Sequence, residues 1–149
     1  MLPSSPQPRP LEASPGRPLY FGGMAQPPSR AVALRYLQGD CGHLALAFHA
    51  LMPGSQLWEV GVGHFAVEDT QGQFWDVRGC MNLAQVWNGM SGPRMTPMTR
   101  DEVIGALNTG VYGDGRFIPS RETAARRLIR DHVPHLDEPM RRVRRRRTP

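Results

Sequence analysis

Three side chains in the middle of the chain have the chemistry of a nucleophile, a base and an orienting acid. Cys41 carries a thiol, His64 an imidazole 23 residues later, and Asp76 a carboxylate twelve residues further on. A thiolate attacks a carbonyl carbon when an imidazole takes its proton, and a carboxylate that accepts from the imidazole fixes the ring. These residue types, in this order, predict cysteine-dependent acyl transfer at an amide.

The stretch from residue 39 to residue 79 contains the elements that must position these groups. An apolar segment over residues 43–52 predicts a buried helix that ends at Pro53-Gly54. Residues 57–62 and 64–68 are rich in β-forming residues and predict strands. Residues 73–77 follow a glycine-containing turn, so we expect them to form a hairpin with 64–68. Cys41 is then at a helix start, and His64 and Asp76 are on neighbouring strands.

The residues around Cys41 support its role as the nucleophile. Asp40 is a good N-cap, because its carboxylate can accept the free N–H groups of the first helical turn. The helix dipole favours a thiolate at this position. The charge of Asp40 opposes that effect, so most of the stabilisation must come from His64. Gly42 would let a substrate carbonyl approach closely, and the Cys41 N–H is a natural oxyanion donor.

These segments also resemble a known superfamily. Asp40-Cys41-Gly42 is similar to the Asp-Cys-Ser-Gly start of NlpC-type endopeptidases. His64-Phe65-Ala66-Val67-Glu68, followed by Trp75-Asp76, is similar to the His and Asp segments of transglutaminase-like proteins. Over about 40 residues the chain thus resembles the papain-like cysteine hydrolases. The resemblance implies Cys41 as nucleophile, His64 as general base and acid, and Asp76 as the orienting residue.

The resemblance also implies a substrate and a fold. The substrate would be a peptide or protein amide, attacked by a peptidase, amidase, deamidase or transglutaminase-like acyltransferase that needs no cofactor. Gln38 is a candidate for the oxyanion side chain by its type, and Tyr36 could contact substrate. We expect an α+β fold, in which a central helix bearing Cys41 packs on a short antiparallel sheet bearing His64 and Asp76.

The remainder of the domain is predicted to be helical. A short helix is expected within residues 81–90, and Thr99 with Glu102 matches a capping box for a helix through Leu107. Ser120 could cap a last helix that runs to about His132. The predicted core consists of apolar residues of these elements: Leu44, Ala47, Phe48, Leu51, Val60, Val62, Phe65, Val67, Phe74, Val77, Trp87, Ile104 and Leu107.

Composition divides the chain into three parts. Residues 1–30 contain eight prolines and predict a disordered segment, although residues 19–21 could dock on the domain. Residues 31–133 form the expected domain, and residues 134–149 a flexible arginine-rich tail. The net charge is +5, and every basic residue is arginine. No apolar run approaches the ~20 residues that span a bilayer, and no secretory signal is recognisable, so we expect a cytoplasmic protein without membrane contact.

Alternative functions remain open. The arginines of the tail, Arg141, Arg142, Arg144, Arg145, Arg146 and Arg147, could bind nucleic acid, with the papain-like fold serving as an inactive interaction module. Cysteine and histidine side chains could ligate zinc, but the spacing of metal-binding pairs is missing, so we expect no metal. A disulfide between Cys41 and Cys80 would remove the nucleophile and needs an oxidising compartment.

Overall fold

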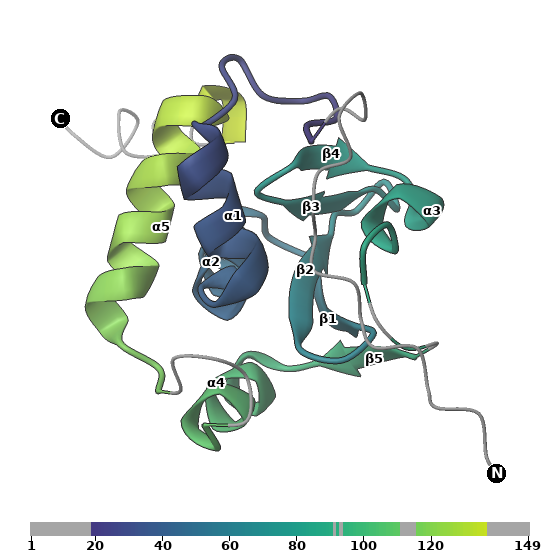
Figure 1. Cartoon of the computed structure of the whole chain (residues 1–149), viewed down its shortest axis with the longest axis vertical. Coiled ribbons are helices and arrows are strands. Elements are labelled where there is room, and N and C mark those ends of the chain that lie inside the picture. The colour runs from purple at the N-terminus through teal and green to yellow at the C-terminus, as the bar shows by residue number, and fades with distance from the viewer. Residues whose placement is uncertain (1–18, 91, 93, 111–115, 137–149) are drawn as a thin grey trace, which may run out of the picture.

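The computed structural model describes residues 19–90, 92, 94–110 and 116–136 (Figure 1). Over these residues the chain forms an α+β fold of five α-helices and one open antiparallel sheet of five strands, which confirms the expected class. In chain order the elements are α1 (Arg30–Gln38), α2 (Cys41–Leu51), β1 (Gln56–Val60), β2 (His64–Glu68), β3 (Phe74–Asp76), β4 (Gly79–Met81), α3 (Leu83–Val86), β5 (Met95–Met98), α4 (Arg100–Asn108), α5 (Pro119–His132) and the 3-10 helix Pro134–Leu136.

The sheet has the strand order β4-β3-β2-β1-β5. The predicted hairpin of β2 and β3 is confirmed, with Val67 opposite Trp75. The sequence analysis missed the two edge strands, β4 and β5, which pair with β3 and β1. The strand expected over residues 57–62 ends at Val60, because Gly61 and Gly63 adopt φ angles of 64° and 80° and turn the chain into β2.

Helix α2 lies between the sheet and α5, whereas α3 lies on the opposite side of the sheet (Figure 1). Nine of the eleven residues of α2 are buried, as its nearly continuous apolar sequence predicts. Leu44 and Phe48 from α2 pack with Phe65 and Trp75 from the strands. Each such side chain stabilises the fold by about 1.5–3 kcal/mol. The three central strands, β1, β2 and β3, therefore pack against the helix that begins at Cys41.

A smaller apolar cluster fills the other side of the sheet, under α3. It contains Val60, Ala66, Phe74, Met81 and Val86. Most of the predicted core residues are buried in one of these two clusters. Val62 is the clear error, since it is 69% exposed in the turn between β1 and β2. Trp87 and Ile104 are only partly buried.

The predicted helix starts were correct where a capping box was present. Thr99 accepts from the N–H of Glu102, whose side chain accepts from the Thr99 N–H. The predicted cap at Ser120 is wrong, because the N-cap of α5 is Ile118, two residues earlier, and the helix begins at Pro119. Proline suits the first helical position, since the N–H that it lacks would have no partner inside the helix.

Part of the proline-rich segment contacts the domain. Within residues 1–30, the structure describes residues 19–30, and these run along β4 to the end of α5 before entering α1 (Figure 1). Ala25 donates its N–H to the carbonyl oxygen of His132 over 2.8 Å. Disorder was predicted for residues 1–30, of which 1–18 lie outside the residues that the structure describes. Of the tail predicted over 134–149, residues 134–136 form the 3-10 helix, and the rest, with the arginines at 141–147, lies outside the described residues.

Candidate active site

The three residues predicted to be catalytic occupy the ends of three elements. Cys41 is the first residue of α2, His64 is the first of β2, and Asp76 is the last of β3. The Nε2 atom of His64 lies 2.9 Å from Oδ2 of Asp76, which is a hydrogen-bond distance. The Sγ atom of Cys41 lies 3.4 Å from the carbonyl oxygen of Gly63, the residue before His64. The fold thus pairs His64 with Asp76 and places the Cys41 thiol against the backbone next to His64.

The Cys41 thiol and His64 are both found at the beginning of β2. Along β2, Phe65 and Val67 pack in the cluster with α2, whereas Ala66 belongs to the cluster under α3. Side chains alternate along a strand, so His64 starts on the side of Ala66. It is nevertheless adjacent to Gly63, the residue against which the Cys41 thiol lies. Cys41 therefore approaches the imidazole past the beginning of β2.

The electrostatic environment keeps His64 and Asp76 charged, although each residue is only 3% exposed. Burial lowers the pKa of His64, but the hydrogen bond to Asp76 and the interaction with Cys41 outweigh it and raise that pKa to about 9. Burial raises the pKa of Asp76, but the Arg78 guanidinium and His64 hold it well below its ordinary value. At neutral pH the pair is an imidazolium and a carboxylate.

The two ring nitrogens of His64 have different surroundings. Nε2 is occupied by Asp76, whereas Nδ1 is buried and has no hydrogen-bond partner among the described residues. In this structure the thiol of Cys41 donates to the carbonyl oxygen of Gly63. Asp76 keeps the ring of His64 in place.

Arg78 is the site residue that the sequence analysis missed. Its Nη2 lies 2.7 Å from Oδ2 of Asp76, and its Nε lies 3.1 Å from both carboxylate oxygens. The same guanidinium donates to the carbonyl oxygens of Val86 at 3.1 Å and Asn88 at 2.8 Å, around the end of α3. A signal was available, because an acid inside an apolar strand needs a partner and Arg78 is the nearest cation in sequence.

The segment before α1 holds the turn that carries Arg78. The N–H of Phe21 donates to the carbonyl oxygen of Arg78 over 2.7 Å, and the N–H of Cys80 donates to that of Gly22 over 2.8 Å. Gly79 has a φ angle of 105°, and a Cβ there would lie 2.4 Å from the Gly22 oxygen. Only glycine allows this close approach. The chain before α1 therefore fixes the position of the turn.

Gly42 has a packing role. It is buried, and a Cβ at this position would lie 2.7 Å from the side chain of Leu107. The missing side chain therefore makes room for α4, and the approach of a substrate carbonyl at Gly42 stays a prediction. Tyr36 is buried, and burial raises its pKa, whereas Gln38 is exposed at the end of α1. The substrate and oxyanion roles expected for Tyr36 and Gln38 stay predictions.

Asp40 occupies the N-cap position of α2, but its carboxylate makes no capping hydrogen bond, so this prediction is wrong. Oδ2 instead accepts from Nε of Arg35 at 2.7 Å, and Oδ1 accepts from Nη1 of Arg121 at 3.3 Å. Two guanidinium groups compete successfully with the backbone for this carboxylate. Asp40 thereby connects α1, α2 and α5.

His43 forms a second buried histidine–acid pair, one turn into α2. Its Nδ1 lies 3.7 Å from Oδ1 of Asp40, and its Nε2 accepts the backbone N–H of Ile118 over 3.0 Å. The ring stacks on Phe117, with centroids 5.5 Å apart. Burial is the main cause that lowers the pKa of His43. This histidine is therefore neutral at pH 7 and ties α2 to the beginning of α5.

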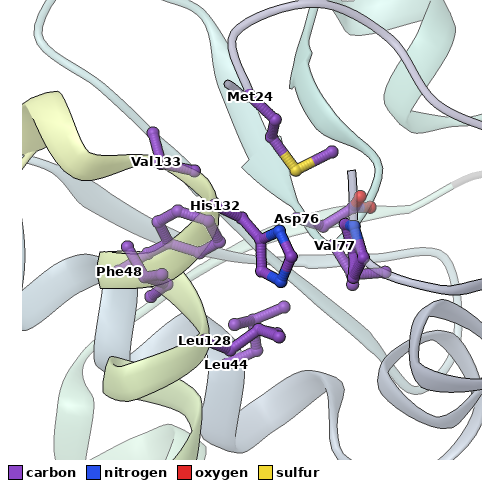
Figure 2. Close-up of a pocket in the computed structure, with 10 residues that line it drawn as sticks. Met24, Leu44, Phe48, Asp76, Val77, Leu128, His132 and Val133 are labelled. Carbon is purple, nitrogen blue, oxygen red and sulfur yellow. The ribbon is translucent and has the colours of Figure 1, made fainter. Parts of the chain in front are cut away.

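A cavity of about 220 Å³, which includes open space at its mouth, lies between α2, α5, the end of β3 and the segment before α1 (Figure 2). Its lining is largely apolar and comprises Met24, Pro28, Leu44, Phe48, Asp76, Val77, Leu128, Ile129, His132 and Val133. Cys41 and His64 are not among these residues. The cavity therefore borders the site behind Asp76 and does not lead to the thiol.

The alternatives that involve the same residues can be compared with the structure. Both cysteines are free thiols, so the disulfide between Cys41 and Cys80 is not formed. Within the described residues, no group of three or more histidine, cysteine or acidic side chains could hold a metal ion. In the same part of the chain, every helix is too short or too polar to cross a membrane. The expected cytoplasmic location stays a prediction.

No protein-family model, no curated protein and no solved structure matches this chain. Its function is therefore inferred from the geometry of Cys41, His64, Asp76 and Arg78.

Proposed function

We propose that this protein is a cysteine-dependent hydrolase or acyltransferase that acts on an amide or peptide bond. The observation that carries the proposal is the position of His64. Its buried imidazole lies 2.9 Å from the Asp76 carboxylate, and it follows Gly63, whose carbonyl oxygen lies 3.4 Å from the Cys41 thiol. A histidine oriented by an acid and placed beside a thiol is the arrangement that activates a cysteine nucleophile.

In the proposed reaction, Cys41 is the nucleophile and His64 carries the proton. The imidazolium of His64 holds the proton that Cys41 has given up, and the Cys41 thiolate attacks the carbonyl carbon of the amide to form a tetrahedral intermediate. The C–N bond then breaks as His64 returns the proton to the leaving amine. The product is a thioester on Cys41. Water or a second amine attacks the thioester after giving its proton to His64, and the thiol is regenerated.

The finer proposal on the fold is that the domain is a small papain-like core. It is supported by the order of the parts: the nucleophile begins a buried helix, the base begins a central strand, and the acid ends the neighbouring antiparallel strand. No observation on the described residues favours the alternative of nucleic-acid binding, and its arginines at 141–147 lie outside them.

Acyl-enzyme formation tests the function before a natural substrate is known. Cys41 is only 6% exposed, so a compact acyl donor such as p-nitrophenyl acetate is the suitable probe. We expect mass spectrometry to show a thioester on Cys41 that forms on the order of 10²-fold faster than on Cys80, because only Cys41 has an adjacent base. Cys80 serves as an internal control. Equal acylation of the two cysteines, unchanged in His64→Gln, would contradict the proposal.

A further inference from the structure

The segment that precedes α1 is a surface loop whose two ends are joined. The hydroxyl of Tyr20 donates to the carbonyl oxygen of Pro28, and most of the residues between them are exposed. A surface loop of this length with joined ends has the form of an Ω-loop, a class of loop that is frequently functional. Residues 20–28 can therefore be treated as one structural unit.

The loop is attached to the rest of the domain at two places. At the turn after β3, in addition to the two backbone hydrogen bonds described above, the ring centroid of Phe21 lies 5.9 Å from Cζ of Arg78. At the end of α5, the N–H of Ala25 donates to the carbonyl oxygen of His132 over 2.8 Å, and Nδ1 of His132 bonds to the carbonyl oxygen of Gln26. The loop thus spans from the sheet to α5.

The loop can leave both places while every helix and strand stays formed. Within the described residues, it pairs with the sheet through a single bridge, between Gly22 and Cys80. The other side of β4 is paired with β3, where Trp75 lies opposite Cys80, and α1 begins after the loop, at Arg30. An exposed segment with few hydrogen bonds opens at a lower free energy than the whole domain unfolds.

The closed loop shields the carboxylate of the candidate site. Met24 and Pro28 lie in the wall of the cavity that Asp76 also lines (Figure 2). When the loop opens, water enters on this side of Asp76, which is only 3% exposed in the closed form. Water raises the effective dielectric constant around a charge, so it would weaken the interaction of Asp76 with His64.

We propose that residues 20–28 form a lid that opens as one unit and that its closure, by excluding water from Asp76, controls the pair of His64 and Asp76. The effect on the reaction rests on the proposed function. With the lid closed, Asp76 holds the ring of His64 in place. With the lid open, the carboxylate is hydrated and Arg78 loses its contact with Phe21, so the ring is held less firmly.

Amide hydrogen exchange of the full chain, followed by NMR, tests the opening. The N–H groups of Phe21, Ala25 and Cys80 each make a hydrogen bond that opening of the lid breaks. After correction for intrinsic rates, we expect them to share one opening constant and to exchange on the order of 10²-fold faster than the amides of β1 and β2. Protection equal to that of β1 and β2 would overturn the inference, as would three unrelated opening constants.

Gly23→Val is designed to hold the lid open. Gly23 has a φ angle of 88°, and a Cβ there would lie 2.8 Å from both the Cβ of Cys80 and the ring of Trp75. A β-branched residue is strongly disfavoured at such an angle. Gly110→Val is the matched control, because Gly110 has a φ angle of 72° but a Cβ there would meet no atom within 4 Å.

In Gly23→Val the three amides should lose their protection, while the amides of β1 and β2 keep theirs. Acylation of Cys41 by p-nitrophenyl acetate should slow by about 10-fold, less than expected for loss of the orienting acid itself. Gly110→Val should change neither the three amides nor the acylation. Should Gly23→Val fail to fold, Gly23→Ala takes its place, and its three amides should exchange about 10-fold faster than in the unaltered chain.

The two measurements distinguish this inference from the proposed function. Open-lid exchange in a folded Gly23 variant, together with an unchanged rate at Cys41, would overturn the control of the site and leave the proposed function standing. Acylation of Cys41 that is no faster than that of Cys80, and unchanged in His64→Gln, would reject the proposed function. Hydrogen exchange would then still decide whether the lid opens as one unit.

Discussion

The fold contains two buried histidine–aspartate pairs near Cys41, and their histidines have pKa values shifted in opposite directions. His64 lies 2.9 Å from Asp76, and its pKa is raised to about 9, so it carries a proton at neutral pH. His43 lies 3.7 Å from Asp40, and its pKa is lowered, so it is neutral. The residue types are the same. The difference is in what the other atoms of each pair contact.

The partners of the ring nitrogens explain the contrast. In His43, Nε2 accepts a backbone N–H from Ile118, and this bond requires a nitrogen without a proton. The carboxylate of Asp40 is used by two arginines and is beyond hydrogen-bond distance of the ring. In both rings Nδ1 is buried without a hydrogen-bond partner among the described residues, but Nε2 of His64 lies against the Asp76 carboxylate and not against a backbone N–H. The partner of Nε2 therefore decides whether the buried ring is neutral or charged.

The largest contrast should come from replacing each histidine. His64→Gln should slow the alkylation of Cys41 at pH 7 on the order of 10²-fold, because the thiol loses its base. His43→Phe should leave that rate within about twofold, since the phenyl ring can still stack on Phe117. It should instead lower the free energy of unfolding by about 1–3 kcal/mol, because the Ile118 N–H loses its acceptor. Alkylation kinetics and urea unfolding measure the two effects, and a similar loss of reactivity in both variants would remove the distinction.

Replacing Asp76 and Asp40 in turn should lower the free energy of unfolding by different amounts. Asp76→Asn leaves the buried Arg78 without its anion and should cost about 3–5 kcal/mol, the usual penalty for breaking a buried ion pair. Asp40→Asn should cost about 1 kcal/mol or less from its ion pairs, because the side chains of Arg35 and Arg121 are 59% and 31% exposed. Urea unfolding provides the comparison. Equal penalties would mean that the two carboxylates are equally important to the fold.

The two histidines should also shape the pH dependence of stability in opposite directions. The folded chain holds a proton on His64 up to about pH 9, whereas an unfolded histidine releases it near pH 6.5, so stability should fall as the pH rises through this window. The lowered pKa of His43 means that the folded chain binds fewer protons below pH 6.5, so stability should fall as the pH drops. Thermal unfolding should show a flatter alkaline side in His64→Gln and a flatter acidic side in His43→Phe. An unaltered alkaline side in His64→Gln would contradict the charged state of His64.

The smallest effect concerns packing beside the nucleophile. Gly42→Ala should destabilise the fold by about 1–3 kcal/mol, because the new Cβ overlaps Leu107, and the pH profile of Cys41 alkylation should not change. Gly105→Ala is the matched control on α4, where a Cβ meets no atom within 4 Å. This control should gain about 0.5–1 kcal/mol. Destabilisation of equal size in both would show that contact with Leu107 is not the cause.

The fold was predictable where local patterns determine it. The apolar helix after Cys41, the hairpin of β2 and β3 and the capping box at Thr99 were each visible in the sequence and are confirmed. The edge strands β4 and β5 were not, because short strands of three or four residues carry little pattern of their own and form by pairing with β3 and β1. The end of β1 was misjudged because Val62 reads as a strand residue but lies in a glycine turn.

The residue types of the candidate site were predictable from the sequence, but the contacts of Arg78 and Gly42 were not. The order of thiol, imidazole and acid indicated three residues that the fold does bring together. Arg78 was missed because its role depends on the turn after β3, which returns the guanidinium to an acid two residues earlier. The packing role of Gly42 was not predicted, because the position of Leu107, 65 residues away in sequence, could not be read from the neighbourhood of the cysteine.

An NMR titration of the five histidine side chains tests the central claim most directly, with Cys41→Ser as the matched variant. The account predicts that the ring of His64 stays doubly protonated until about pH 9 and that its midpoint falls when the thiol is removed. His43 should titrate below the ordinary value in both proteins. A midpoint for His64 at or below about 6.5, unchanged in Cys41→Ser, would show that Cys41 and His64 do not form the proposed pair.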